Sequence, residues 1–284
     1  MKSKIYERFK HLSADEWFEV LKLALKEGIV EGIKFPKFVH ISRLGSATPE
    51  EAIKEGIRFY KLCEPFLTEY KKKQPYSHFL DFGCGTGRLS YIFMKDFPPE
   101  NILGVDVIPD FIDICKKSFG EIGNFFVIPN RPPTSIPDKS VDIIVAYSVF
   151  SHLSIFQNLR WMREFARILR DGGLIFFTTY GKGFLNYLYK TDDSKIISSG
   201  HKKMKHFYYS ISEDFLNFFS EILDKGEMLY FPSGSQDYNP FDYGVAFLSK
   251  GFLERFWGEC FELQCFKDDY NLLEQAFVCL KKKL

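Results

Sequence analysis

The chain has 284 residues, which is enough for one large domain or two small ones. Apolar residues make up 45% of it, so a full hydrophobic core is available, and its formal net charge of +1 argues against non-specific nucleic-acid binding. No apolar run is long enough to span a membrane and the six cysteines include no C-x-x-C pair, so we expect a cytoplasmic protein without a membrane segment or a metal site.

Residues 1–75 are predicted to form an N-terminal helical extension. The run Ser13-Ala14-Asp15-Glu16 is a capping box that opens a helix extending to about Glu27. Thr48-Pro49-Glu50-Glu51 marks a second helix start, with proline at the first helical position. Pro65 lies within this second helix and is expected to kink it.

Residues 76–180 alternate short apolar runs with stretches of helical periodicity. The predicted helices cover residues 87–97, a segment after Pro109, and residues 154–170. The predicted strands are 76–82, 101–107, 125–128, 141–147 and 174–180, the last of them after a turn at Asp171-Gly172-Gly173. Strands that alternate with helices predict an α/β fold, in which a parallel sheet carries helices on both faces.

Residues 181–248 lose this rhythm and mix Gly, Lys, Ser and Asp with many aromatic residues. A long excursion of this kind is usually functional, and we interpret it as a cap inserted over the carboxyl edge of the sheet, on the substrate side. Regular patterns return in 249–284, where a helix at 249–257 and strands at 261–266 and 276–280 are expected to complete the core.

A glycine turn follows the first predicted strand. Gly83, Gly85 and Gly87 occupy alternate positions, and Asp81 precedes them. A turn with so few side chains lets a ligand approach main-chain N–H groups, and the helix start behind it adds partial positive charge. We therefore expect a carboxylate or a phosphate to bind here. The spacing differs from the nucleotide-binding G-x-G-x-x-G, because Arg88 stands where the last glycine would be.

An acidic residue ends the second predicted strand. Asp106 lies 19 residues after Gly87, close to the roughly 20 residues that separate the glycine turn from the ribose-binding acid in doubly wound folds. We expect its carboxylate to accept hydrogen bonds from both hydroxyls of a nucleotide ribose. The two features at this spacing are more specific than either alone.

A third motif occupies residues 138–153, where D-x-S-x-D-x-I leads into S-V-F-x-H-L. Together with the glycine turn and Asp106, it resembles the class I S-adenosylmethionine-dependent methyltransferases. Residues 169–174 are similar to the L-x-P-G-G turn of that family, with Asp171 in place of proline. The resemblance covers 79–180, is weaker over 249–284, extends upstream to the stretch from Arg43 to Gly56, and does not include 181–248.

The resemblance implies a Rossmann-like, seven-stranded methyltransferase sheet with helices on both faces, a helical extension before it and an aromatic-rich insertion before the last two strands. Residues 76–180 would bind S-adenosylmethionine and release S-adenosylhomocysteine. Residue by residue, it places the amino acid end of the cofactor on the glycine turn, the ribose on Asp106, the adenine against two apolar residues and a loop, and the methyl group at the end of the fourth strand. The implied cofactor-binding residues are Asp81, Gly83, Cys84, Gly85, Thr86, Gly87, Asp106, Val107, Ile108, Asn130, Arg131, Tyr147 and Ser148.

Methyl transfer from a sulfonium is an in-line displacement, so positioning supplies much of the rate enhancement. We expect a small-molecule or sugar acceptor, with oxygen favoured over nitrogen as the nucleophile. A hydroxyl nucleophile benefits from a general base, and His152, just past the fourth strand, is the candidate. His152 could equally cap the helix that follows it. His201, His206 and Asp237 are the alternative candidates in the insertion.

Other function classes stay open at this point. A non-catalytic, methyltransferase-like binding protein would use the aromatic insertion to hold a partner. An NAD(P)-dependent oxidoreductase would use Asp106, although the glycine spacing and the third motif do not fit it. Asn130-Arg131-Pro132-Pro133 is faintly similar to the N-P-P-aromatic motif of amine-methylating nucleic-acid enzymes, but Arg131 interrupts it. The acceptor and the oligomeric state are not predicted.

Overall fold

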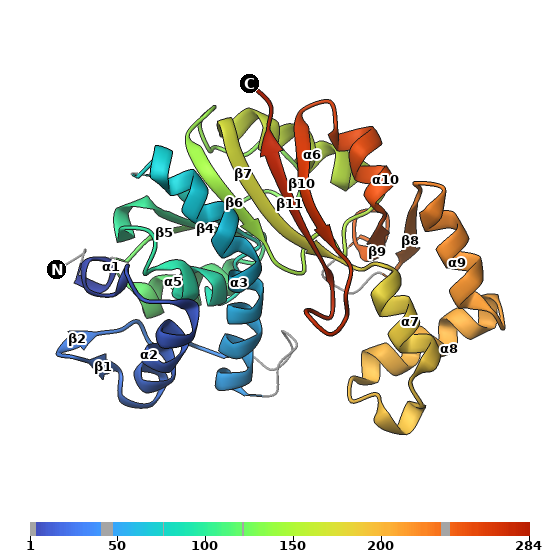
Figure 1. Ribbon diagram of the computed structural model, residues 1–284, viewed down its shortest axis with the longest axis horizontal. Coiled ribbons are helices and arrows are strands. Elements are labelled where there is room, and N and C mark those ends of the chain that lie inside the picture. Colours follow the sequence, from blue (N-terminus) through green and yellow to red (C-terminus); the bar gives the residue numbers. More distant parts are fainter. Residues whose placement is uncertain (1–3, 41–47, 76, 121, 234–238) are drawn as a thin grey trace. The chain divides into compact units, whose positions relative to one another are not determined.

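The computed structural model describes residues 4–40, 48–75, 77–120, 122–233 and 239–284 (Figure 1). The chain divides into two compact units. The first consists of Met1–Tyr147, Glu164–Phe176 and Leu284, and the second of Ser148–Arg163 and Phe177–Lys283. No helix within the described residues is both long enough and apolar enough to cross a membrane.

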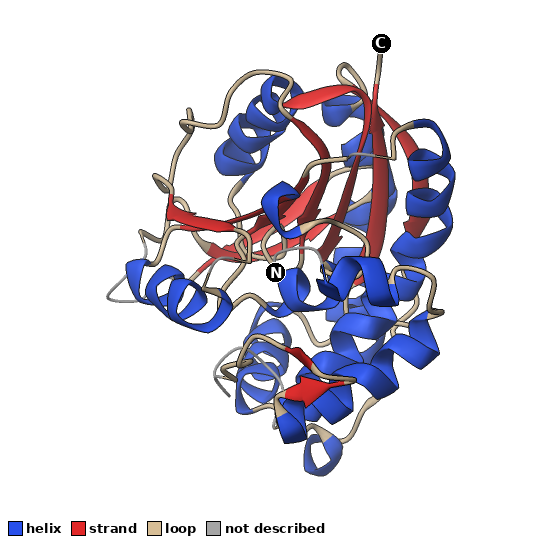
Figure 2. Ribbon diagram, turned by 90° about the vertical axis from the view of Figure 1, so that its left-hand side faces the viewer, coloured by secondary structure: helices blue, strands red, loops and turns tan. Residues whose placement is uncertain are grey.

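Seven strands of the described residues form one sheet, in the order β10-β11-β7-β6-β3-β4-β5. β3 is paired in parallel with β4 and with β6, and β4 is paired in parallel with β5. The last two strands form an antiparallel pair. The strands are β3 (Phe79–Phe82), β4 (Ile102–Asp106), β5 (Asn124–Val127), β6 (Val141–Ala146), β7 (Leu169–Thr179), β10 (Phe261–Lys267) and β11 (Ala276–Lys282). The predicted α/β fold with a Rossmann-like sheet is confirmed, and Figure 2 shows its strands side by side in red.

The N-terminal helices begin where the capping boxes predict. Ser13 caps α2 (Ala14–Glu27) with both reciprocal hydrogen bonds to Glu16, and the helix ends at Gly28 in the left-handed conformation. Thr48 caps α3 (Pro49–Lys73) in the same way, and α3 runs past Pro65 without ending there. The sequence did not predict the helix α1 (Lys4–Phe9) or the short antiparallel pair β1 (Ile29–Val30) and β2 (Ile33–Lys34).

Three core strands of unit 1, β3, β4 and β6, are shorter than predicted. β3 starts at Phe79, so the predicted strand residues before it are not strand where they are described, and residue 76 lies outside the described part. The helices between the strands are α4 (Arg88–Phe93), the 3₁₀ turn η2 (Pro99–Asn101) and α5 (Pro109–Phe119). The short strands β3 and β6 are buried along their whole length, and parallel pairing joins β3 to β4 and β4 to β5.

The expected turn at Asp171-Gly172-Gly173 is wrong. α6 (Ile155–Ile168) ends before Leu169, and β7 runs directly through these three residues. Gly173 is needed because a Cβ there would lie 2.8 Å from the carbonyl oxygen of Asp142. The glycine therefore allows a close approach of β7 to the start of β6 rather than a reversal of the chain.

The insertion is more regular than its sequence indicates. It contains α7 (Lys182–Lys190), the 3₁₀ turn η3 (Asp193–Lys195), α8 (Ser199–Ile211), α9 (Phe215–Asp224) and an antiparallel pair of strands, β8 (Met228–Pro232) and β9 (Gly244–Leu248). Its aromatic residues build a core of their own, in which Tyr208 and Phe247 are completely buried. A short helix α10 (Lys250–Phe252) continues as a π-helical turn, η4 (Leu253–Trp257), and leads into β10.

Candidate cofactor site

The candidate site lies at one edge of the sheet in unit 1. Because β5, β4, β3 and β6 are neighbours and parallel, their carboxyl ends meet at the same edge. The chain leaves β3 toward β4 on one side and returns to β6 on the other, so the strand order reverses between β3 and β6. Ligands of open α/β sheets bind at such a reversal, outside the carboxyl ends of the strands.

The glycine loop at the end of β3 is held through its backbone N–H groups, mostly by acceptors on β4. The N–H groups of Gly83 and Cys84 both donate to the carbonyl oxygen of Val105, at 2.8 and 2.9 Å, and the Gly87 N–H donates to the carbonyl oxygen of Cys84 at 2.8 Å. The Gly85 N–H donates to Asp106 Oδ2 at 2.9 Å. The loop therefore differs from our expectation that its N–H groups receive the ligand, because four of its donors are already used inside the protein.

At Gly87 two independent constraints require a glycine. Its φ of +85° lies in the left-handed region. A Cβ there would also lie 2.5 Å from Cε2 of Phe119 and 3.3 Å from Sγ of Cys115, both on α5. The loop and α5 thus pack against each other through the missing side chain of Gly87.

Asp81 lies one residue before the end of β3 and is buried. Its Oδ2 accepts hydrogen bonds from Ser90 on α4, at 2.9 Å from the N–H and 2.8 Å from the hydroxyl. Burial raises the pKa of Asp81 to about 6, although the two Ser90 hydrogen bonds oppose that rise. The carboxyl group therefore anchors the first turn of α4 to the sheet, behind the glycine loop.

Asp106 ends β4, and its carboxylate connects the end of this strand to the glycine loop after β3. One carboxylate oxygen accepts from the Gly85 N–H, and the other accepts from the Ile108 N–H at 3.0 Å. Burial raises the pKa of this group, and the backbone hydrogen bonds oppose the rise. A carboxylate has about four acceptor sites, so these backbone hydrogen bonds leave acceptor capacity for ligand hydroxyls. Val107 and Ile108, which follow, are half-buried.

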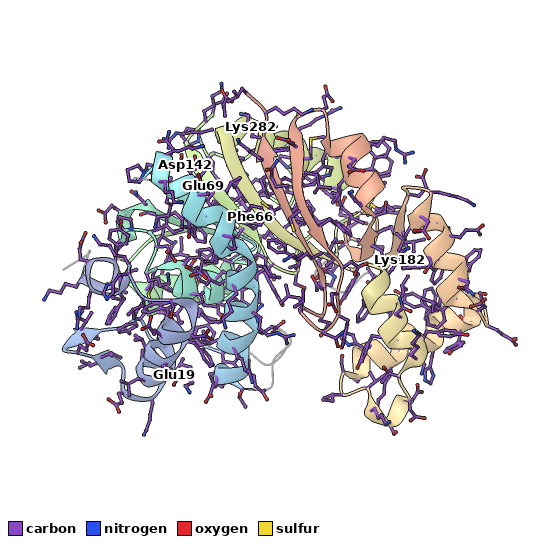
Figure 3. All side chains as sticks on the ribbon, viewed as in Figure 1. Glu19, Phe66, Glu69, Asp142, Lys182 and Lys282 are labelled. Carbon is purple, nitrogen blue, oxygen red and sulfur yellow. The ribbon has the colours of Figure 1, made fainter. Side chains whose placement is uncertain are left out.

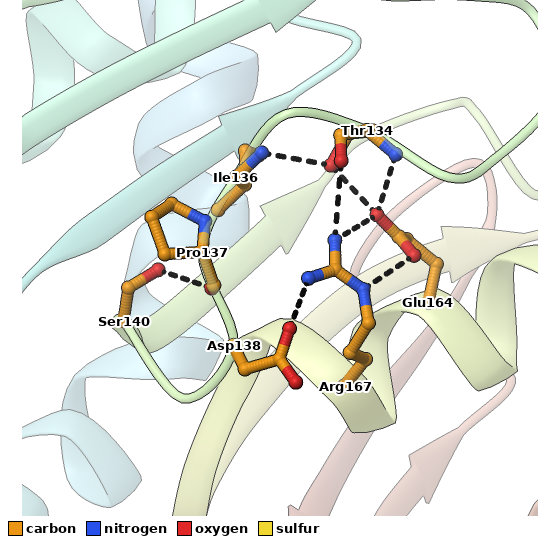
Figure 4. Close-up of polar contacts among 7 residues, drawn as sticks. All are labelled: Thr134, Ile136, Pro137, Asp138, Ser140, Glu164 and Arg167. Carbon is orange, nitrogen blue, oxygen red and sulfur yellow. Dashed lines mark hydrogen bonds and ion pairs between the residues drawn. The ribbon is translucent and has the colours of Figure 1, made fainter.

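The loop after β5 carries the exposed residues Asn130 and Arg131 and is fixed to α6 a few residues later (Figure 4). The buried carboxylate of Glu164 accepts from the N–H and the hydroxyl of Thr134, at 2.8 and 2.6 Å. Arg167 donates to the same carboxylate at 2.6 Å and to Asp138 at 2.5 Å. Burial favours a higher pKa for Glu164, but these hydrogen bonds and the Arg167 charge hold the pKa below its usual range. The loop is therefore a fixed part of unit 1.

A cluster of Glu55, Arg88 and Tyr147 stands at the reversal between β3 and β6. Arg88 Nη1 donates to Glu55 Oε2 at 3.0 Å, and the Tyr147 hydroxyl donates to Glu55 Oε1 at 2.5 Å. The Arg88 guanidinium also lies over the Tyr147 ring, 4.6 Å from its centroid. Sequence reasoning found Tyr147 and noted Arg88 as a departure from the nucleotide pattern, but it gave no signal for Glu55, which comes from α3.

Residues 80–175 match the family model described as a methyltransferase domain. These residues contain the glycine loop, Asp106, the third motif and most of β7. The chain carries a class I S-adenosylmethionine-dependent methyltransferase domain. S-adenosylmethionine is the cofactor expected for such a domain.

Individual relatives agree with this assignment. Malonyl-[acyl-carrier protein] O-methyltransferase of Priestia megaterium is 26% identical over 141 residues, which is 50% of this chain and 48% of that protein. The chain spans less than half the length of the curated relatives it matches first.

Two solved structures show the same fold. The PH0226 protein from Pyrococcus horikoshii OT3 has a TM-score of 0.52 at 18% identity, over 88% of this chain and 96% of that one. An S-adenosylmethionine-dependent methyltransferase from Clostridium acetobutylicum has a TM-score of 0.52 at 14% identity, over 79% and 92%.

Beyond Tyr147 the chain enters unit 2, where Ser148 belongs to a closed hydrogen-bonded ring. The Ser148 N–H donates to Thr178 Oγ1 at 2.8 Å, and the Thr178 hydroxyl donates to Gln275 Oε1 at 2.7 Å. Gln275 Nε2 then donates to Ser148 Oγ at 2.8 Å. Ser148 has a φ of +57°, which a non-glycine residue adopts only when its surroundings hold it there. Gln275 and Thr178 were not found from the sequence.

His152 is also in unit 2 and is tied to β9. Its Nδ1 lies 2.9 Å from the carbonyl oxygen of Gly244, and its ring stacks on Tyr243 at 4.9 Å and 11°. Burial lowers the pKa of His152, although the Gly244 carbonyl opposes this. The side chain is therefore neutral at pH 7. Since a carbonyl can only accept, Nδ1 carries the proton and Nε2 keeps its lone pair.

The alternative residues in the insertion have other partners. His201 Nε2 lies 3.1 Å from Glu274 Oε1, and His206 Nε2 lies 2.5 Å from Asp193 Oδ2. Asp237 lies outside the described residues. Within the described part of the chain, no group of His, Cys, Asp and Glu side chains could hold a metal ion.

Asp142, labelled in Figure 3, accounts for part of the third motif in structural terms. Its buried carboxylate accepts from the His78 N–H at 2.7 Å, from Arg170 at 2.5 Å and from the Tyr70 hydroxyl at 2.9 Å. These contacts join the starts of β6 and β3 to β7 and α3, at the amino edge of the sheet. A cavity of about 350 Å³, lined in part by His78, Glu100 and Asn124, opens at the same edge, opposite the glycine loop. Neither feature belongs to the cofactor site.

Proposed function

We propose that this chain is an S-adenosylmethionine-dependent methyltransferase that moves the methyl group by in-line displacement to an oxygen atom of a small-molecule or sugar acceptor. The observation that carries the proposal is the hydrogen bond from the Gly85 N–H to the Asp106 carboxylate. It joins the glycine loop to the strand-end acid at the reversal of the sheet, where a nucleotide ligand of this fold binds.

The cofactor contacts are part of the proposal. Asp106 would accept hydrogen bonds from both ribose hydroxyls through the acceptor capacity that its backbone hydrogen bonds leave, and Val107 and Ile108 would pack against the adenine. Asn130 and Arg131 would meet the adenine amine, since the loop that carries them is fixed through Thr134. The methionine end would lie along the glycine loop, and Tyr147 and Ser148 would line the methyl side. These loop contacts would come from Asp81, Gly83, Cys84, Gly85, Thr86 and Gly87.

His152 would be the general base. Its Nδ1–H is bound to the Gly244 carbonyl, so Nε2 is the atom able to take a proton, and its lowered pKa keeps that atom unprotonated at neutral pH. A neutral acceptor of this kind suits a hydroxyl nucleophile, which must lose its proton. It suits a carboxylate less, because a carboxylate has no proton to give. The names of the relatives, O-methyltransferases, support an oxygen acceptor.

We further propose that residues 181–248 select the acceptor and that the protein is cytoplasmic. The buried aromatic core of this segment supports a stable substrate side. The six cysteines all lie within the described residues and form no disulfide there, which supports a reducing compartment.

A thermal-shift assay with S-adenosylmethionine, S-adenosylhomocysteine, NAD and NADP tests the proposal. A ligand present at about 100 times its Kd stabilises the native state by about 2.7 kcal/mol. We expect only the two adenosyl ligands to raise the midpoint, and Asp106→Ala to abolish the rise. Asp110→Ala, which removes an exposed acid in the first turn of α5, is the matched control and should keep it. A shift with NAD or NADP alone overturns the proposal, and no shift at all favours a non-catalytic protein.

A further inference from the structure

The glycine loop offers few backbone N–H donors to the carboxylate of an adenosyl amino acid. The N–H groups of Gly83, Cys84, Gly85 and Gly87 are bound within the protein, so they cannot form the cradle that their sequence pattern predicts. In the first turn of α4, the Ser90 N–H is bound to Asp81. An anionic carboxylate that reaches this loop therefore needs a positively charged side chain beside it.

Arg88 is placed to supply that charge. It is the first residue of α4, directly after Gly87, and its side chain is 17% exposed, so a ligand can reach it while the surrounding protein restricts it. A guanidinium carries five N–H donors, and among the residues that the structure describes one hydrogen bond, to Glu55, engages it. The Nη1 bond to Glu55 and the stacking on Tyr147 hold the guanidinium plane in one orientation.

The other arginines near this edge are placed less well. Arg131 is exposed and follows β5, which is separated from β3 by β4. Arg58 is exposed on α3, one turn beyond Glu55. Of these three arginines, Arg88 alone is partly buried, has a guanidinium plane held in one orientation, and directly follows the glycine loop in the chain.

We propose that Arg88 binds the methionine carboxylate of S-adenosylmethionine, and that Glu55 and Tyr147 are positioning residues that hold its guanidinium ready. The inference rests on the proposed function and deepens it. The unengaged edge of the guanidinium can take a carboxylate in a bidentate pair, while Nη1 stays on Glu55. Arg88 stands where the nucleotide-binding pattern has its last glycine. Under this proposal the same residue recognises the carboxylate of an amino acid instead of a pyrophosphate.

Isothermal titration of the full chain with S-adenosylmethionine and with decarboxylated S-adenosylmethionine tests this inference. The two ligands share the sulfonium, the amine and the adenosine, and differ only in the carboxylate. Arg88→Met should weaken S-adenosylmethionine about 10- to 100-fold and leave the Kd of the decarboxylated ligand within about twofold, as expected for the loss of a charge-assisted hydrogen bond. Arg88→Lys keeps the positive charge but not the forked geometry of the guanidinium, so its Kd for S-adenosylmethionine should lie between those of the unmodified chain and Arg88→Met. Arg58→Met is the control and should change neither Kd.

Each result decides the matter. If Arg88→Met weakens the binding of both ligands equally, the substitution has damaged the site as a whole. If it weakens neither, another residue binds the carboxylate of S-adenosylmethionine. Both results overturn the assignment. A loss specific to S-adenosylmethionine in Arg58→Met reassigns the role to Arg58 and overturns it too. If the unmodified chain binds neither ligand, the proposed function itself fails and the assignment of Arg88 falls with it.

Discussion

Replacing Gly87 by alanine tests how the glycine loop and α5 are packed. The left-handed φ of +85° costs an L-residue about 1–2 kcal/mol. The new methyl group would also lie 2.5 Å from Cε2 and 2.9 Å from Cζ of Phe119. Phe119 is buried and its ring centroid lies 4.9 Å from that of Phe125, so it has little room to retreat, and overpacking of this kind costs about 1–3 kcal/mol. The free energy of unfolding should therefore fall by about 2–5 kcal/mol, as measured by urea unfolding.

Gly28→Ala is the matched control. Gly28 ends α2 with a φ of +71° in the same left-handed region, and nothing lies within 4 Å of a Cβ built there, so this variant loses stability through the backbone conformation alone. Gly87→Ala should exceed it by about 1–3 kcal/mol, the overpacking part of the total. Equal losses in the two variants would mean that the loop moves away from α5 freely, and the close packing described above would not constrain it.

Two further changes probe Asp81 and the ring around Ser148. Burial raises the folded-state pKa of Asp81 to about 6, above its ordinary value, so the stability linked to its proton is complete below about pH 4 and is lost as the pH rises through 6. The asparagine of Asp81→Asn does not titrate, so between pH 4 and 7 the parent chain should lose about 3 kcal/mol of unfolding free energy relative to this variant. Urea unfolding measures this difference, and parallel pH profiles of the two proteins would contradict it. Gln275→Leu leaves the buried Thr178 hydroxyl without its acceptor and should cost about 1–3 kcal/mol in the same assay. Thr178→Val removes that hydroxyl but also the acceptor of the Ser148 N–H, so the double variant should lose less than the sum of the two single losses; strictly additive losses would show that the ring is not one unit.

The parts of the fold that sequence predicts well are those set by neighbours in the chain. The capping boxes at Ser13 and Thr48 each involve residues three positions apart, and both helices start where these boxes predict. The glycine loop, the strand that precedes it and Asp106 are likewise local signals of backbone conformation and strand end.

The parts that sequence reasoning missed depend on residues far apart in the chain. Glu55 meets Arg88 and Tyr147, which lie 33 and 92 positions away, and Gln275 meets Ser148 across 127 positions. No spacing rule connects such residues before the sheet order is known. The same reason explains the error at Asp171-Gly172-Gly173, because only the approach of β7 to Asp142 shows why glycine is needed there.

The insertion was misjudged for another reason. Its helices carry aromatic residues on their buried faces, and Phe, Tyr and Trp are less typical of helices than leucine or alanine, so the segment lacks a strong helical signature. Packing against β8 and β9 overrides that weak preference, as the buried Phe215, Phe219 and Phe247 show.

The way the chain alternates between its two units limits how the protein can be dissected. A fragment ending at Tyr147 would contain every proposed cofactor contact except Ser148, but it would lack Glu164–Phe176, which also belongs to unit 1. β6 would lose its neighbour β7 and become an unpaired edge, and Asp142 would lose Arg170. Limited proteolysis or simple truncation should therefore give an aggregating product rather than an isolated cofactor-binding half. Obtaining that half in soluble form calls for a redesigned connection that joins residue 147 directly to residue 164.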